Sequence, residues 1–171
     1  MNHKPEPDTT LDHAPWSASP PRGAQLDGGA LTSDDYYTPK WLFDAINLTF
    51  DIDVASPPQG PPHTPCKRFY TKADNGLIQP WYGRVWMNPP YSKPKPWVER
   101  WINHGNGIAL LPMNGGQWLN TLWNSNAKGV WLGRLPFIRN GKEQKGTSFN
   151  VVLWAIGNDN IDAISTIGYA R

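Results

Sequence analysis

The residues best suited to chemistry in this chain are Asn88-Pro89-Pro90-Tyr91. The side-chain oxygen of Asn88 and the backbone carbonyl of Pro89 can each accept one N–H of an exocyclic amino group. Pro90 stiffens the loop and fixes the direction of that carbonyl. Tyr91 offers a flat ring on which a nucleobase can stack. A base bound in this way first has to leave its duplex, so these four residues predict base flipping.

An ordinary Pro-Pro turn is the alternative, because the chain contains 18 prolines. The position of the segment favours a functional role. It follows the short apolar run Arg84-Val85-Trp86-Met87, which predicts a buried strand that stops where the segment begins. We therefore expect Asn88 to lie at the end of a strand.

The elements that position this loop alternate along the chain from residue 34 onward. Thr38 is the expected N-cap of the first helix, with Pro39 at its first helical position. Asn140-Gly141 predicts a tight hairpin turn near the C-terminus. The pattern predicts an α/β fold with a mostly parallel sheet and one antiparallel C-terminal edge strand. The expected helices cover 40–48, 96–103, 118–126 and a short stretch from 159, and the expected strands cover 50–55, 68–70, 84–87, 107–112, 130–137 and 149–156.

Ligands of open α/β sheets bind at the carboxyl ends of the strands, and further candidate residues fall there. Asp53, Ala55 and Ser56 follow one strand, and a polar turn, Asp74-Asn75-Gly76-Leu77, comes after the next. Tyr37-Thr38-Pro39 precede a helix, whose free N–H groups suit a ligand carboxylate. S-adenosylmethionine has an amino acid end, a ribose and an adenine, and these three elements could serve its three parts.

With these segments in order, residues 34–156 resemble the phage-type DNA N-6-adenine methyltransferases, a Dam-like family of small S-adenosylmethionine-dependent enzymes. The resemblance rests on Tyr37-Thr38-Pro39-Lys40-Trp41, Phe50-Asp51-Ile52-Asp53-Val54-Ala55-Ser56, Cys66 before Phe69, Asp74 before Gly76-Leu77, Trp81, Asn88-Pro89-Pro90-Tyr91-Ser92, and Gly133-Arg134-Leu135 with Phe137.

The resemblance implies a Rossmann-like methyltransferase fold with Asn88 to Tyr91 as the catalytic loop. It also implies that Asp53 and Ala55 belong to the cofactor site, that Thr38-Pro39 form an N-terminal cofactor motif, and that Asp74 faces the cofactor's adenine. The chain departs from the wider methyltransferase pattern after the first strand, where Pro57-Pro58 replace the expected glycine-rich turn.

The chemistry expected of such a site is direct methyl transfer. The lone pair of adenine N6 is delocalised into the ring, and two acceptors on its hydrogens favour a pyramidal nitrogen that can attack the methyl group. Direct transfer needs no thiolate, so Cys66 is expected to be a small buried hydrophobe. Other amine targets remain open: cytosine N4, RNA or a protein glutamine. A non-catalytic DNA-binding module that keeps the fold also remains open.

Charge is distributed unevenly, with a net −2 over residues 1–33 and +4 over residues 34–171. We expect residues 1–33 to form a disordered tail, because they are rich in Pro, Gly, Ser and Asp, and residues 34–171 to form one methyltransferase domain. A basic cluster near the hairpin is the candidate contact for double-stranded DNA. It consists of Arg134, Arg139, Lys142 and Lys145.

The single cysteine excludes an intrachain disulfide and indicates a reducing compartment. The resemblance to a phage-type family implies that this compartment is the cytoplasm of a bacterial or phage-infected host cell. No apolar run is long enough to cross a membrane, and no secretory signal is evident. No metal site is expected, because His104 is the only residue that could join His63 and Cys66 as a further ligand.

Overall fold

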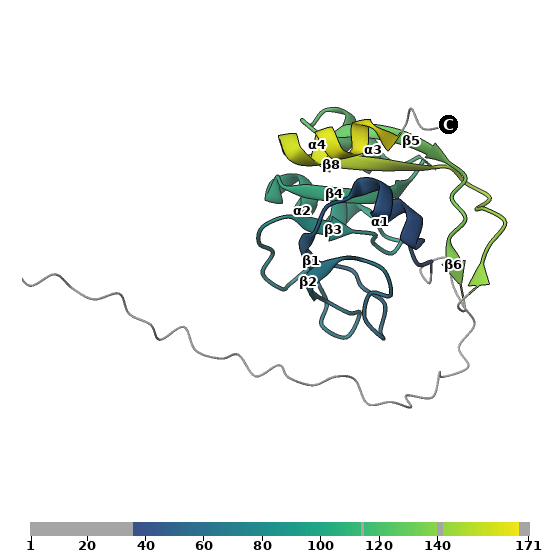
Figure 1. Cartoon of the computed structure of the whole chain (residues 1–171). Coiled ribbons are helices and arrows are strands. Elements are labelled where there is room, and N and C mark those ends of the chain that lie inside the picture. Colours follow the sequence, from purple (N-terminus) through teal and green to yellow (C-terminus); the bar gives the residue numbers. More distant parts are fainter. Residues whose placement is uncertain (1–35, 114, 140–141, 168–171) are drawn as a thin grey trace, which may run out of the picture.

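The computed structural model describes residues 36–113, 115–139 and 142–167, and these form a mixed α/β fold (Figure 1). The predicted tail, residues 1–33, lies outside the described residues. The helices are α1 Lys40–Ile46, α2 Lys95–His104, α3 Gln117–Trp123 and α4 Asn158–Ser165. The strands are β1 Phe50–Asp53, β2 Cys66–Phe69, β3 Val85–Met87, β4 Gly107–Pro112, β5 Lys128–Gly133, β6 Ile138–Arg139, β7 Lys142–Glu143 and β8 Val151–Ile156.

Six strands form the central sheet, in the order β2-β1-β3-β4-β8-β5. β1 pairs in parallel with β2 and β3, and β3 pairs in parallel with β4. β8 is antiparallel to both β4 and β5. The expected mostly parallel sheet with one reversed strand is confirmed, but the reversed strand is not at the edge. All six residues of β8 are buried, whereas β5 is largely exposed, so the apolar β8 occupies the interior position and β5 forms the edge.

Helices cover both faces of the sheet. On one face, α2 and α3 contribute five side chains to a core that includes Ala109 and Leu111 of β4, and on the other, α1 and α4 pack over Ile108 and Leu110. Alternate residues of β4 thus enter different cores, as the two-residue period of a strand requires. The helical side chains in the two cores are Trp97, Val98, Trp101, Trp118 and Leu122 on the first face and Leu42, Phe43, Ile46 and Ile164 on the second.

The hairpin differs in detail from its prediction. Of the expected strand 130–137, only residues 130–133 are strand and belong to β5. β6 begins beyond the expected strand, at Ile138, and pairs with β7 in a separate two-stranded sheet that projects beside the main sheet (Figure 1). Arg139 pairs with Lys142, which brackets the predicted turn at Asn140-Gly141, and that turn lies outside the described residues. The hairpin is therefore an arm that extends the β5–β8 pair.

The start of the first helix also differs by one residue. The N-cap of α1 is Pro39, and no side chain caps it, so the prediction that Thr38 is the N-cap is wrong. The helix ends at Ile46, and its C-cap is Asn47, whose φ of 52° is left-handed, a conformation that asparagine tolerates better than most residues. Thr38 is buried and has a different contact, described below. In the part of the chain that the structure describes, no helix has the length and apolar character needed to cross a bilayer.

Candidate active site

The carboxyl ends of β1, β2 and β3 lie side by side at one edge of the sheet. Asp53 is in register with Phe69 of β2 and with Trp86 of β3. The chain passes from β1 to β2 on one side and returns to β3 on the other, so the strand order reverses between β1 and β3. Such switch points are where open α/β sheets bind ligands. Ala55 and Asn88 emerge there, which brings the predicted cofactor and catalytic segments together.

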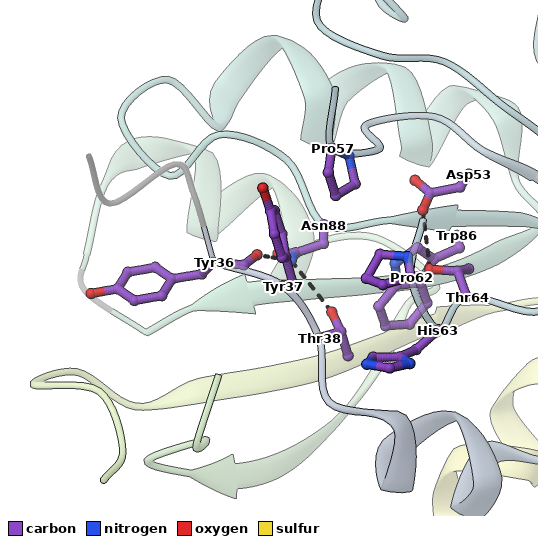
Figure 2. Close-up of a pocket in the computed structure, with 10 residues that line it drawn as sticks. All are labelled: Tyr36, Tyr37, Thr38, Asp53, Pro57, Pro62, His63, Thr64, Trp86 and Asn88. Carbon is purple, nitrogen blue, oxygen red and sulfur yellow. Dashed lines mark hydrogen bonds between the residues drawn. The ribbon is translucent and has the colours of Figure 1, made fainter. Parts of the chain in front are cut away.

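Asn88 is held by its amide nitrogen, and its amide oxygen is left without a partner. The Nδ2 atom donates to the Tyr36 carbonyl at 3.2 Å and to Thr38 Oγ1 at 3.4 Å, as Figure 2 shows. The Oδ1 atom is buried and has no hydrogen-bond partner among the described residues. A buried acceptor without a partner is rare in native proteins and costs about 1–3 kcal/mol. An incoming N–H group would satisfy it.

A pocket of about 300 Å³ lies beside this loop. Tyr37, Ala55 and Ser56, all predicted cofactor residues, line it together with Pro90 of the predicted catalytic loop. Its volume is at the lower end of the range of about 300–1,000 Å³ that is usual for small-molecule sites. Four other residues in the wall of the pocket were not predicted from the sequence: Pro58, Thr71, Lys72 and Trp97. Their only sequence signal is their position, after β1, after β2 or on α2.

Asp53 and Thr38 do not line that pocket but a smaller cavity of about 20 Å³ next to it, which Asn88 also lines (Figure 2). The carboxylate of Asp53 accepts hydrogen bonds from the Ala55 backbone N–H and the Thr64 hydroxyl, each at 3.1 Å. Burial raises the pKa of Asp53 to about 7. Asp53 therefore fixes the loop that forms the larger pocket, and a cavity of this size holds about one water molecule.

Asp74 serves the turn in which it lies. Its carboxylate accepts hydrogen bonds from the Thr71 backbone N–H and hydroxyl, both at 2.7 Å, and these bonds lower its pKa. It is exposed and does not line the larger pocket, whereas its neighbours Asn75 and Gly76 do. Gly76 presses against the end of β1, where a Cβ would lie 2.0 Å from the Val54 carbonyl oxygen. Pro39, also a predicted cofactor residue, lines neither the pocket nor the small cavity.

Arg100 and Trp81, which were not among the predicted site residues, hold the chain segment that forms part of the wall of the larger pocket. The Arg100 guanidinium donates to the Leu77 and Gln79 carbonyls and lies 4.7 Å from the centre of the Trp81 ring. Trp81 Nε1 in turn donates to the Gly76 carbonyl at 2.8 Å. Sequence reasoning missed Arg100, because a lone arginine on a helix carries no pattern that distinguishes it from a solvated one.

Tyr91 is anchored by both its hydroxyl and its ring. The hydroxyl donates to the Leu110 carbonyl at 3.3 Å, and burial raises the pKa of the phenol. The ring packs edge-on with Phe137 and Phe149 at centroid distances of 6.3 and 5.7 Å. Tyr91 also lines a groove of about 500 Å³, together with Trp118. The ring is thus held in one orientation at the border of an open groove.

The predicted DNA-contacting residues lie on the arm formed by β6, β7 and their flanks. Arg134, Lys142 and Lys145 are exposed, and Arg139 lies 5.6 Å from the centre of the Tyr36 ring. The arm contacts the segment that holds Asn88, because Tyr37 and Ile138 exchange two backbone hydrogen bonds at 3.0 and 2.9 Å. Within the basic cluster, Arg139 is the residue that lies against this segment, and the other three are on the same arm.

Cys66 is half-buried in β2, and burial, with the nearby Asp53 carboxylate, raises the pKa of its thiol to about 12. A thiol with this pKa is protonated at neutral pH and is a poor nucleophile. Within the described residues, no group of three His, Cys, Asp or Glu side chains could hold a metal ion.

Comparisons with known proteins identify the family of the chain. A family model described as DNA N-6-adenine-methyltransferase (Dam) matches residues 30–166. The DNA N-6-adenine-methyltransferase of Haemophilus phage HP1 (strain HP1c1) is 33% identical over 120 residues, which cover 63% of this chain and 68% of that protein. The enzyme of the same description from Escherichia phage T1 is 33% identical over 91 residues, 48% of this chain and 37% of that protein. No solved structure matches the chain. This chain belongs to the DNA N-6-adenine-methyltransferase (Dam) family and is an adenine-specific DNA methyltransferase.

Proposed function

We propose that this protein transfers a methyl group from S-adenosylmethionine directly to N6 of an adenine that has been flipped out of double-stranded DNA, with Asn88-Pro89-Pro90-Tyr91 as the catalytic loop. The observation that carries the proposal is the buried Asn88 Oδ1 atom, an acceptor that has no partner among the described residues. The predicted chemistry requires an acceptor at this place and nothing else in the described fold uses this atom.

The role of Asn88 is to accept one N–H of the target amine, and the role of the Pro89 carbonyl is to accept the other. Each bond strengthens as the nitrogen becomes pyramidal and its hydrogens become more acidic, so it stabilises the transition state more than the ground state. The groups are preorganised, because the amide nitrogen of Asn88 is already held and the loop contains two prolines.

The pocket lined by Tyr37, Ala55, Ser56 and Trp97 fits the donor. It joins polar groups at strand ends to the ring of Trp97, a combination that suits a ligand with an amino acid end and an adenine. When bound, S-adenosylmethionine supplies an electrophilic methyl group. Asp53 and Asp74 support the pocket from behind, through the Ala55 loop and the Thr71 turn.

The basic arm provides the DNA contacts in this proposal. Arg134, Lys142 and Lys145 are exposed cations on the arm that pairs with the segment that holds Asn88, so phosphates bound there would bring the duplex toward the site. Tyr91, at the border of the groove, provides a ring for the flipped base.

Asn88→Ala tests the proposal. It removes one acceptor from the target amine and leaves the residues of the larger pocket unchanged. We expect kcat to fall on the order of 10²–10³-fold, the loss typical of removing one preorganised transition-state contact, while the Kd for S-adenosylmethionine stays within about twofold of wild type. Methylation by Asn88→Ala at the wild-type rate would show that the loop is only a turn.

A further inference from the structure

We propose that the segment Tyr36–Thr38 is the positioning element of the catalytic amide, and that it makes an amide obligatory at position 88. The inference rests on the proposed role of Asn88. It assigns Thr38 as a positioning residue that acts through Asn88, in place of the predicted contact with the cofactor.

The polarity of the Asn88 side chain follows from its surroundings. An asparagine side chain has one donating and one accepting end, and only its hydrogen bonds decide which way it faces. Here both partners of the side chain, the Tyr36 carbonyl and the Thr38 hydroxyl, accept from Nδ2. A rotation of the amide by 180° would bring its oxygen against the Tyr36 carbonyl oxygen. The orientation that leaves Oδ1 available is therefore the favoured one.

The segment that supplies these two acceptors is itself fixed. Tyr37 exchanges two backbone hydrogen bonds with Ile138 of β6. The Tyr36 ring packs against Phe137 and Phe149, at centroid distances of 5.3 and 6.2 Å. A carbonyl held between these contacts cannot turn away from Asn88 without breaking them.

Thr38 has two other conceivable roles, and the structure favours neither. It does not cap α1, whose N-cap is Pro39. It does not line the larger pocket, and its side chain is buried beside Asn88 and Asp53 at the small cavity. Its hydroxyl contact with Asn88 is the interaction that remains.

A carboxylate at position 88 would be a stronger acceptor for the target amine, yet this site disfavours it. Aspartate has no donor for the Tyr36 carbonyl, and two oxygen acceptors would face each other in a buried place. We expect Asn88→Asp to lose activity about as severely as Asn88→Ala, on the order of 10²–10³-fold in kcat. Wild-type turnover by Asn88→Asp would overturn the proposal.

Thr38→Val and Thr38→Ser complete the test, with exposed Thr121→Val on α3 as the matched control. Thr38→Val keeps the shape and removes the hydroxyl, so kcat should fall about 3- to 10-fold, the equivalent of one modest hydrogen bond, with an unchanged Kd for S-adenosylmethionine. Thr38→Ser, which keeps the hydroxyl, should stay within about twofold of wild type, like Thr121→Val.

A double-mutant cycle distinguishes action of Thr38 through Asn88 from direct contact of Thr38 with the cofactor. If Thr38 acts through Asn88, Thr38→Val should have no further effect on kcat in the Asn88→Ala background. A raised Kd for S-adenosylmethionine with an unchanged kcat would place Thr38 in the cofactor site and overturn the inference. Equal losses in Thr38→Ser and Thr38→Val would overturn it too, even if the valine variant folds poorly. Neither result bears on the proposed function, which a fully active Asn88→Ala variant would overturn instead.

Discussion

Asp53→Asn should change how the stability of the protein depends on pH while leaving the proposed cofactor pocket intact. The Asp53 side chain is 3% exposed, and burial raises its pKa to about 7. Asparagine has nearly the same shape. Its oxygen can accept from the Ala55 N–H and its nitrogen can donate to the Thr64 hydroxyl, so both contacts of the carboxylate are replaced.

The sign of the effect follows from proton linkage. An aspartate in the unfolded chain has a pKa of about 3.9, so between about pH 4 and pH 7 the folded protein holds a proton that the unfolded chain has lost. The free energy of unfolding therefore falls as the pH rises through this window and levels off above about 7. Between pH 5 and pH 8 ionisation of the Asp53 carboxyl should lower the free energy of unfolding of wild type by about 2–3 kcal/mol, and Asp53→Asn should not show this decrease.

Urea denaturation at pH 5 and pH 8 measures the difference. Asp51→Asn is a suitable control, because the hydrogen bond from Lys67 lowers the pKa of Asp51. The contribution of the Asp51 carboxylate to the free energy of unfolding is complete above the unfolded pKa of about 3.9 and is lost only in acid. The change in the free energy of unfolding between pH 5 and pH 8 should therefore be the same in Asp51→Asn as in wild type. Parallel curves for wild type and Asp53→Asn would refute the reasoning. Asp53→Ala, which removes both hydrogen bonds, should weaken S-adenosylmethionine binding in a calorimetric titration.

Three further predictions concern the tail, the tyrosine and the arm. Removing residues 1–33 should leave cooperative unfolding and cofactor binding unchanged, and an insoluble or molten product would show that the domain begins earlier. Tyr91→Leu should weaken DNA binding by about 1–3 kcal/mol in an anisotropy titration, and Tyr91→Phe should not, because the ring makes the proposed contact. Equal affinities for both variants would exclude stacking. Replacing Lys142 and Lys145 with alanine should reduce the slope of log K against log salt by about 1.8, and an unchanged slope would exclude phosphate contacts there.

Local patterns were sufficient to predict most elements of the fold. The apolar run 107–112 predicted β4 with its observed bounds, and Asn88 follows β3 directly, as expected. The place of β8 could not be predicted in the same way. Runs such as 151–156 report that a strand is buried on both faces, but which neighbours it pairs with is decided by packing across the whole sheet.

The candidate site was predicted at the level of segments more than of atoms. The sequence placed Ala55, Ser56 and Tyr37 near the catalytic loop, and all three line the larger pocket. It did not reveal that Thr38 would turn toward Asn88, because that contact joins residues 50 positions apart. Long-range side-chain contacts of this kind follow from the assembled fold and leave no periodic signal in the sequence.

The most direct test of the central claim is to incubate the protein with S-adenosylmethionine carrying a labelled methyl group and with unmethylated double-stranded DNA, and then to separate the nucleosides. Our account predicts label in N6-methyldeoxyadenosine and its loss on the order of 10²–10³-fold in Asn88→Ala. Label in N4-methyldeoxycytidine, or no label in DNA from well-folded protein that binds the cofactor, would contradict it.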